Sequence, residues 1–323
     1  MSQGRSFRVG TRASRLALWQ TARVRELLEA AGSPTEQLEI RTTGDMAAEV
    51  PLSQIGSRAV FTRQIDEAML EGRIDLAVHS LKDLPTELPE GITLAAVSER
   101  EDARDALVGH GELTWEEIPH GAIVATSSLR RRAQLLHLRP DVQVTEIRGN
   151  VDTRLAKLEA HPEWTAILLA TAGLVRLGLG HRIGDRLSPG LFLPAPGQGA
   201  LAVTARSDDS TAIAAARAAI HHSPTARAVS AERAFLRRLE GGCQVPVAAY
   251  AEDEGATGHL RLHGRVVSLQ GERAVEGVEE DAAGDERTAA AIGTLLAERL
   301  LARGAAEILA SARSAASAVV SEP

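Results

Sequence analysis

The chain has one cysteine, Cys243, in 323 residues. A single cysteine excludes an internal disulfide and a metal site made of several thiolates, so a special role for Cys243 must be that of a lone nucleophile or an attachment point. The alternative is a small buried side chain without chemistry, which is the usual state of a free cysteine. Two glycines precede Cys243 and Pro246 ends the turn, an arrangement that permits close approach of a ligand and presents the thiol.

The sequence also lacks a long apolar run and an export segment. No stretch approaches the length of about 20 apolar residues that a membrane helix needs, and residues 1–5 lead directly into a short strand-like run. Together with an unpaired cysteine, this predicts a cytoplasmic protein. The composition, 44% apolar and 24% charged, is ordinary for compact folded domains.

Net positive charge is absent as well. The formal net charge of -7 argues against general nucleic-acid binding, which needs a basic face. It leaves room for a local basic cleft, because clustered arginines focus the field within one pocket whatever the total charge is. The positions of the arginines therefore matter more than their number.

The first such position is the turn between a strand at residues 7–10 and a predicted helix of about 17 residues. This turn holds Arg12 and Ser14 next to the free N–H groups of the helix, which suits an anion. The alternative is an ordinary helix cap with a solvated arginine.

The same design recurs after a strand at residues 122–125. Thr126 and Ser128 precede a helix whose first turns carry Arg130 and Arg131. Basic residues at a helix N-terminus oppose the usual rule, which places acidic residues there. This unfavourable arrangement predicts a bound anion.

Lys82 and Asp83 follow an apolar strand at residues 74–79. In open α/β sheets, ligands bind beyond the carboxyl ends of the strands. The pair is either a solvated loop pair of opposite charge, the commoner situation, or a site in which neighbouring cations keep the carboxylate ionised so that it stabilises a positive intermediate. Position alone leaves both interpretations open.

Strands alternating with helices predict mostly parallel sheets with covered faces. The pattern restarts near residue 105, which indicates two hinged α/β lobes, and a strand at residues 201–204 is predicted to return to the first lobe. After residue 221 the pattern changes to a small α+β domain with an antiparallel sheet. The predicted division is residues 1–103 and 200–220 for the first lobe, 104–199 for the second, and 221–323 for the C-terminal domain. A solvated linker is expected at residues 221–224 and fraying at residues 304–323.

Six motifs in order along the chain resemble the porphobilinogen deaminase (hydroxymethylbilane synthase) family. They cover about residues 5 to 303, and together they are highly specific. The motifs are Gly10-Thr11-Arg12-Ala13-Ser14, His79-Ser80-Leu81-Lys82-Asp83-Leu84-Pro85, Thr126-Ser127-Ser128-Leu129-Arg130-Arg131, Arg148-Gly149-Asn150-Val151-Asp152-Thr153-Arg154, Pro196-Gly197-Gln198-Gly199 and Gly241-Gly242-Cys243-Gln244-Val245-Pro246.

The resemblance implies an α/β fold with two lobes like those of periplasmic binding proteins. It also implies a transferase that joins four porphobilinogen molecules head to tail, with loss of ammonia, and releases hydroxymethylbilane by hydrolysis. The primer would be a dipyrromethane cofactor linked to Cys243 by a thioether. Such an enzyme serves tetrapyrrole biosynthesis (heme, chlorophyll or corrinoid), and the family expectation is a monomer that passes its product to a downstream cyclase.

The resemblance also implies roles for individual residues. Asp83 would be catalytic, because one carboxylate near the pyrrole nitrogens stabilises the cationic stages and assists proton movement. Arginine suits the acetate and propionate groups of the substrate because its planar fork binds carboxylates with two hydrogen bonds. Cofactor binding would involve Cys243, Lys82, Asp83, Ser14, Thr126, Ser128, Arg130 and Arg131. Substrate binding would involve Arg12, Arg148, Arg154, Arg176 and Gln198. No metal ligand is expected.

The sequence departs from the family pattern in a segment expected to form a mobile lid. The family commonly has Gly-Lys-Gly-Leu-Phe and a further lysine there, whereas this chain has Arg58, Ala59 and Arg63. The positive charge is retained, but alanine in place of glycine reduces backbone freedom. Arg58 and Arg63 are the lid candidates.

A second class of function also fits hinged lobes with anion-binding turns. A non-catalytic two-lobed anion-binding module would explain the arginines and the hinge. It would need neither the cysteine loop nor Asp83. A thiol hydrolase is weaker still, because the sequence marks no histidine as the base for Cys243.

Overall fold

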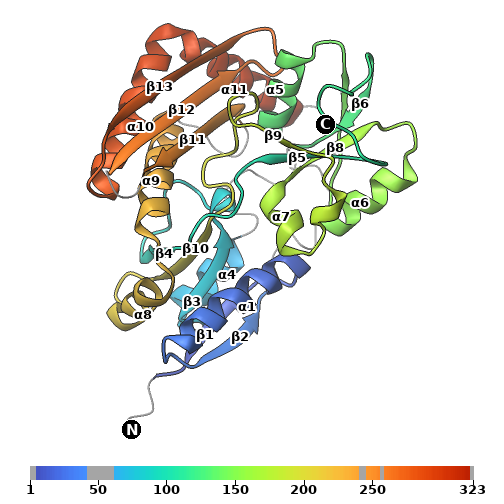
Figure 1. Ribbon diagram of the computed structural model, residues 1–323. Helices are drawn as coiled ribbons and strands as arrows, with labels where there is room; N and C mark the ends of the chain where they lie inside the picture. The colour runs from blue at the N-terminus through green and yellow to red at the C-terminus, as the bar shows by residue number, and fades with distance from the viewer. Residues whose placement is uncertain (1–4, 42–61, 240–244, 255–257, 321–323) are drawn as a thin grey trace.

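The fold contains three sheets, each with its own helices (Figure 1). The computed structural model describes residues 5–41, 62–239, 245–254 and 258–320, and side chains as far as residue 315. In Figure 1, the first sheet is blue to cyan except for the yellow-gold β10, the second runs from teal to yellow-green, and the third is orange to red. Among the described residues, no helix is long and apolar enough to span a membrane.

The first sheet has the strand order β2-β1-β3-β10-β4. Valine, leucine and alanine side chains of its strands fill the core between the sheet and helices α1 and α8. The strands are β1 (Phe7–Thr11), β2 (Thr35–Glu39), β3 (Leu76–Ser80), β4 (Ile92–Val97) and β10 (Leu201–Arg206). The helices are α1 (Arg15–Ala30), α4 (Arg63–Leu70) and α8 (Ser210–Ile220).

The second sheet repeats this order as β7-β6-β8-β5-β9. Leu107, Val124 and Leu168 lie in the core on one face, and Val108, Ile167 and Leu169 lie in the core on the other. The strands are β5 (Asp105–Gly109), β6 (Ile123–Ala125), β7 (Gln143–Thr145), β8 (Ala166–Ala170) and β9 (Asp185–Leu187). The helices are α5 (Leu129–Leu138), α6 (Val151–Ala160) and α7 (Thr171–Arg176).

The expectation of mostly parallel sheets is wrong, because each of the two α/β sheets is mixed. β1 pairs in parallel with β2 and β3, but β10 is antiparallel to β3 and β4. Likewise β6 is parallel to β7 and β8, whereas β5 is antiparallel to β8 and β9. β5 and β10 are the strands by which the chain enters the second sheet and returns to the first, so each starts from the opposite end of its sheet. The predicted return of residues 201–204 to the first sheet is confirmed.

The third sheet is the antiparallel meander β11-β12-β13, covered by α9 and α10 (Figure 1). The fold class is therefore the predicted one: two α/β units and a small α+β unit with an antiparallel sheet. The strands of this third unit are β11 (Val247–Asp253), β12 (His259–Val267) and β13 (Ala274–Ala282). Its helices are α9 (Ser223–Arg238), α10 (Glu286–Leu300) and α11 (Ala306–Val320).

Three local predictions are wrong. The sequence predicts a second strand at residues 38–42, but this strand lies at residues 35–39, where it pairs in register with β1. The expected solvated linker is ordered, because the His222 side chain caps α9 and accepts from the Thr225 N–H at 3.4 Å. The tail does not fray over its described part, since Ile308 and Leu309 of α11 are buried in the third core.

Both crossings between the first two sheets are tied to the third unit by one buried carboxylate, Glu232 of α9. It binds the Arg100 guanidinium at 2.6 Å in the first crossing and accepts from the Gly197 N–H at 2.7 Å in the second. It also accepts from the Ala251 N–H at 2.8 Å in β11. The side chain is 0% exposed, so these partners compensate for its desolvation.

Candidate functional site

Lys82 and Asp83 lie in the short 3-10 turn Leu81–Asp83, directly after β3. β3 is held between β1 and β10, and the Leu81 N–H donates to the Ala200 carbonyl at 3.0 Å. Leu81 is fully buried, whereas Asp83 is exposed. The fold therefore fixes the start of the turn and leaves the Asp83 carboxylate accessible at the edge of the sheet.

A cavity of about 70 Å³ lies beside Asp83. Three side chains predicted from the sequence, Arg12, Ser14 and Asp83, line the same cavity, although they come from two different strand–turn units. The other lining residues are Leu16, Ala17, Gln20, Thr62, Val78, His79 and Ser80. The structure thus brings the first predicted anion turn and the predicted catalytic carboxylate together.

His79 is a cavity residue to which the sequence analysis gave no role. Burial, assisted by the positive charge of Arg12, lowers the pKa of His79 to about 4, so the imidazole is neutral near pH 7. Its Nε2 lies 3.3 Å from the Thr204 hydroxyl. The sequence feature that could have identified His79 is a polar ring near the end of an otherwise apolar strand.

Lys82 extends to the other side of the turn. Its Nζ donates to Gln198 Oε1 at 3.2 Å. Burial lowers the pKa of Lys82 to about 8; Arg131 and Arg130 also lower it, while Asp83 and Asp105 act in the opposite direction. The amine therefore titrates close to physiological pH.

Asp105, at the start of β5, organises the cations that follow β6. Its carboxylate accepts from Arg130 at 2.6 and 3.1 Å and from Arg131 at 2.7 and 2.9 Å. Gln198 Nε2 donates to the same carboxylate at 3.0 Å. Burial alone would raise the pKa of Asp105, but the two guanidiniums hold it well below its usual range.

No motif in the sequence marks Asp105, and the unfavourable placement of Arg130 and Arg131 predicted a bound anion. The structure supplies an anion from within the chain, because both guanidiniums are almost completely buried against this carboxylate. One carboxylate faces two guanidiniums, and Arg130 Nε is buried without a hydrogen-bond partner. This cluster remains cationic and keeps an unused donor.

The predicted hydroxyls lie at helix N-termini. Ser14 Oγ accepts from the Ala17 N–H at 3.3 Å, and Ser128 Oγ accepts from the Arg131 N–H at 3.4 Å. Thr126 Oγ1 accepts from the Ser128 N–H at 3.2 Å. A hydroxyl that accepts in this way still has its own O–H to donate, so capping does not prevent contact with an anion.

Arg154 and Arg148 continue the cationic surface toward Asp83. Arg154 Nε donates to the Gly149 carbonyl at 2.8 Å. Burial lowers the pKa of Arg154 to about 10, and the nearby charges of Arg131 and Arg148 act in the same direction, whereas Asp83 opposes them. The effect of the Asp83 charge on the pKa of Arg154 indicates that these two side chains interact electrostatically.

Arg176 of α7 lies at the second crossing. Its Nη2 donates to the Gly199 carbonyl at 2.5 Å, and its guanidinium carbon lies 5.8 Å from the centre of the Trp19 ring in α1. Burial lowers the pKa of Arg176 to about 10. Arg176 thus links the second α/β unit to both the crossing and the first helix.

The predicted lid residue Arg63 does not line this cavity. Arg63 is exposed on α4 and pairs with Glu67 at 2.9 Å, as an ordinary helical i,i+4 pair. Arg58 and Cys243 lie outside the described residues. Within the described parts of the chain, no group of three or more His, Cys, Asp or Glu side chains is arranged to hold a metal ion.

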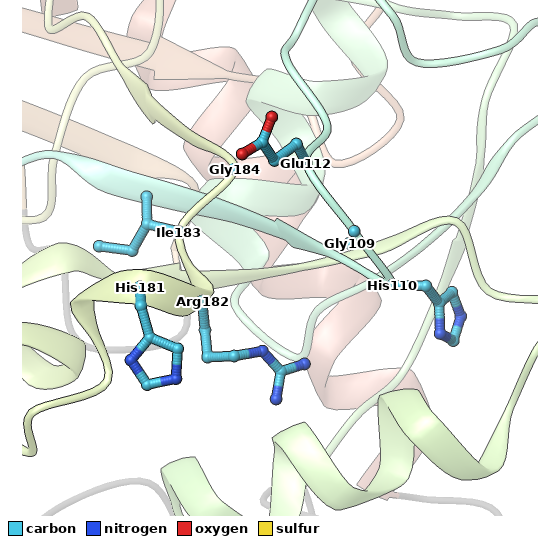
Figure 2. A pocket seen from close by; sticks show the side chains of 8 residues that line it. Gly109, His110, Glu112, His181, Arg182, Ile183 and Gly184 are labelled. Carbon is cyan, nitrogen blue, oxygen red and sulfur yellow. The ribbon is translucent and has the colours of Figure 1, made fainter.

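A larger cavity of about 160 Å³ lies on the second unit, at the outer end of β5 (Figure 2). It contains none of the predicted site residues. His110 and Arg182 line it, but His110 Nε2 lies 2.9 Å from the Trp164 carbonyl and Arg182 binds Glu159 at 2.5 Å. The smaller cavity beside Asp83 therefore has the stronger chemical case. The lining residues of the larger one are Gly109, His110, Gly111, Glu112, His181, Arg182, Ile183 and Gly184.

Comparison with known proteins covers most of the chain. Residues 7–214 match the family model "Porphobilinogen deaminase, dipyromethane cofactor binding domain", and residues 226–302 match "Porphobilinogen deaminase, C-terminal domain". The chain is 48% identical to the porphobilinogen deaminase of Geobacter metallireducens over 308 residues, which is 95% of this chain and 94% of that protein. It is also 48% identical to that of Moorella thermoacetica over 305 residues, which is 94% of this chain and 95% of that protein.

Two solved structures match at low sequence identity. The methionine-binding protein MetQ matches with a TM-score of 0.42 and 11% identity, over 66% of this chain and 89% of its own. A putative methionine-binding lipoprotein from Bacillus subtilis matches with a TM-score of 0.43 and 12% identity, over 68% of this chain and 92% of its own.

Proposed function

Because the chain belongs to the porphobilinogen deaminase family, we propose that the cavity beside Asp83 and the cations around it form its active site. The activity is that of a porphobilinogen deaminase, also called hydroxymethylbilane synthase, an enzyme of tetrapyrrole biosynthesis with a dipyrromethane cofactor-binding domain. The observation that carries the site assignment is the convergence of Asp83 with Arg12 and Ser14 on one cavity. Porphobilinogen is the substrate that the family implies.

The donor set around Asp83 fits a ligand with several carboxylates. Cations outnumber carboxylates in the cluster of Lys82, Arg130, Arg131, Asp83 and Asp105. Arg130 Nε lacks a partner, and hydroxyls stand at two helix N-termini, where the helix dipole favours negative charge. When bound, the dipyrromethane supplies the pyrrole primer to which substrate units are added.

We assign cofactor binding to the residues nearest this cluster and substrate binding to the residues around it. Cys243 would provide the thioether, since it is the only thiol in the sequence. The cofactor-binding set is Cys243, Lys82, Asp83, Ser14, Thr126, Ser128, Arg130 and Arg131. The substrate-binding set is Arg12, Arg148, Arg154, Arg176 and Gln198, with Arg58 and Arg63 as lid residues.

Asp83 is assigned the chemical role. Its exposed carboxylate lies at the cavity, with Lys82 and Arg154 within electrostatic reach. A fixed anion stabilises the positive charge that develops on the substrate as ammonia leaves, and it can accept the proton that is lost when the new carbon–carbon bond forms.

The domain division remains a proposal: residues 1–103 and 200–220, residues 104–199, and residues 221–323. It is supported by the three sheets and by the two crossings before β5 and β10. We also propose that the enzyme is a monomer that acts in the cytoplasm, where a lone thiol stays reduced, and that it passes its linear product to a cyclase. Sedimentation of the purified protein tests the first point and cell fractionation tests the second.

The first experiment weighs the intact purified protein beside Cys243→Ser. A mass excess equal to two linked pyrrole units, present only when Cys243 is present, supports the thioether assignment. If the protein is unmodified, porphobilinogen is added and the mass is measured again. Continued absence of an adduct would contradict the anchor and favour the anion-binding module.

The second experiment tests Asp83. Asp83→Asn should fold and bind substrate, because the carboxylate is exposed and supports no part of the core. It should lose most ammonia release, by roughly 100-fold or more, because a general acid–base group contributes 10²–10⁴-fold. Near-normal turnover would remove Asp83 from the mechanism.

A further inference from the structure

Arg233 of α9 makes an unusual set of contacts with the backbone that follows Asp83. Its Nη2 donates to the Pro85 carbonyl at 2.7 Å and to the Thr86 carbonyl at 3.3 Å, and its Nη1 donates to the Leu84 carbonyl at 3.4 Å. One guanidinium therefore binds three successive carbonyls. These are the three residues directly after the proposed catalytic residue.

Two other arginines of α9 pair with carboxylates. Arg227 binds Asp253 at 2.7 and 2.9 Å, and Arg238 binds Glu298 at 3.2 Å. Arg233 has no salt bridge with any carboxylate in the described parts of the chain. Burial lowers the pKa of Arg233 to about 10. Desolvating a guanidinium without a counter-ion is costly, and the three carbonyls are the groups that compensate for it.

The two sides of the Asp83 turn are held by different parts of the fold. The amino-terminal side is fixed by β3 and by the Leu81 N–H bond to Ala200. On the carboxyl-terminal side, Leu84 packs with Val229 of α9 in a small apolar cluster, and Arg233 binds the carbonyls beyond it. The apolar contact sets the distance to α9, whereas the three hydrogen bonds set the direction of the backbone.

We propose that Arg233 is a positioning residue for the reaction: it fixes the backbone after Asp83 against α9 and so holds the Asp83 carboxylate at the cavity. The inference rests on the role proposed above for Asp83. In the sequence, Cys243 follows α9 closely, only four residues after Leu239. The helix that leads to the proposed cofactor anchor therefore also holds the turn of the proposed catalytic residue.

The test uses the cofactor-bearing enzyme with Arg233→Met, which keeps an unbranched apolar stem but removes the guanidinium and every donor. Misplacing a reacting group by about 1 Å costs up to 10²-fold in rate, so kcat per cofactor-bearing chain, counted by intact mass, should fall roughly 10- to 100-fold. KM should change little, because the proposed substrate-binding arginines are intact. Arg233→Lys has donors for one or two carbonyls and should recover part of the loss.

Arg227→Met is the matched control, since it removes an arginine from the same helix and leaves Asp253 without this buried partner. It should lower the unfolding midpoint in urea while kcat stays near that of the parent. If Arg233→Met had the same kcat as the parent enzyme, the proposal would be overturned. Equal losses of kcat in Arg233→Met and Arg227→Met would also overturn it.

A double-mutant cycle separates positioning from general stability. If Arg233 acts through the carboxylate, Arg233→Met should cost less in an Asp83→Glu background, where the carboxylate is already displaced, than in the parent. Equal fold-losses in both backgrounds would show a structural role only. If Arg233→Met fails to fold, Arg233→Lys takes its place in the cycle. Near-normal turnover of Asp83→Asn would instead remove the proposed role of Asp83, which is a separate result.

Discussion

Replacing Asp105 with asparagine tests the buried network that organises the cations of the site. Asparagine keeps the shape of the side chain but replaces one acceptor oxygen by an NH₂ group, so guanidinium donors of Arg130 and Arg131 lose their acceptor. Breaking a buried ion pair costs roughly 3–5 kcal/mol. Asp105 is 0% exposed and serves two arginines, so we expect the upper part of this range.

The assay is urea unfolding. With a urea dependence of about 3 kcal/mol per molar for a long chain, a loss of about 4 to 5 kcal/mol should lower the midpoint by roughly 1.3 to 1.7 M. The folded-state pKa of Asp105 is depressed, so its stabilisation is complete above the unfolded pKa and is lost as the pH falls through the folded value. The difference between the two proteins should therefore be equal at pH 5 and pH 7 and should shrink in stronger acid.

The cofactor makes this prediction sharper. If Arg130 and Arg131 also bind the cofactor, its carboxylates replace part of the lost charge, and Asp105→Asn should cost less in the cofactor-bearing protein than in a Cys243→Ser background. Asp253→Asn, which removes a buried partner of Arg227 in the third unit, should cost the same in both. An equal loss for Asp105→Asn in both forms would refute the ligand role of these arginines. No loss in either form would refute the ionic network.

Three further outcomes follow from single residues. Because the pKa of Lys82 is lowered to about 8, its charge is present below pH 8 and lost above it, so substrate turnover should decline as the pH rises through 8. Lys82→Arg stays charged and should move this decline to higher pH. An unchanged pH profile would mean that Lys82 has no role in binding. Burial raises the pKa of Asp66 to about 6, so stability is lost as the pH rises from the unfolded pKa of about 4 to that value, and the loss is complete above it. Asp66→Asn should therefore raise the free energy of unfolding at pH 7.5 by up to about 3 kcal/mol, measured as a higher urea midpoint; a gain that persists at pH 4 would contradict this cause. In Gly199→Ala, where φ is +94, the new Cβ would lie 2.3 Å from the Glu101 carbonyl oxygen. This substitution should cost more stability than Gly178→Ala, where φ is +74 and no atom lies within 4 Å of the new Cβ. Equal losses of stability would mean that the backbone of the crossing shifts to make room.

Local patterns were sufficient to predict most elements. The strands predicted at residues 7–10, 74–79, 122–125 and 201–204 become β1, β3, β6 and β10, with bounds that differ by at most two residues. The helix of about 17 residues predicted after the first strand becomes α1, with 16 residues, because periodicity reports which face of an element is buried. α8 was missed, since its alanine-rich sequence has little contrast between its faces. The direction of β5 and β10 could not be predicted, because it depends on where the chain arrives from in space.

The site shows the same limit in its charges. Arg130 and Asp105 are 25 residues apart, and Gln198 is 93 residues from Asp105. No spacing rule connects such positions, so the sequence indicated an excess of cations without showing which of them already had an anion. Arg233 was not singled out for a related reason: its partners are backbone carbonyls, which carry no residue type to recognise.

The presence of Asp105 changes how the cationic site should be understood. Two guanidiniums buried without a carboxylate would repel each other and would be drawn toward solvent. Asp105 holds both in fixed positions before any ligand arrives, and each remaining hydrogen bond to a main-chain carbonyl, from Arg130 to Leu193 and from Arg131 to Leu168, restricts them further. Binding of an anionic ligand then has a smaller cost in side-chain entropy. In return, the negative charge of Asp105 reduces the attraction between the arginines and the ligand. A site that must first hold and finally release a polyanionic chain benefits from this compromise, since fully unpaired arginines would retain the product.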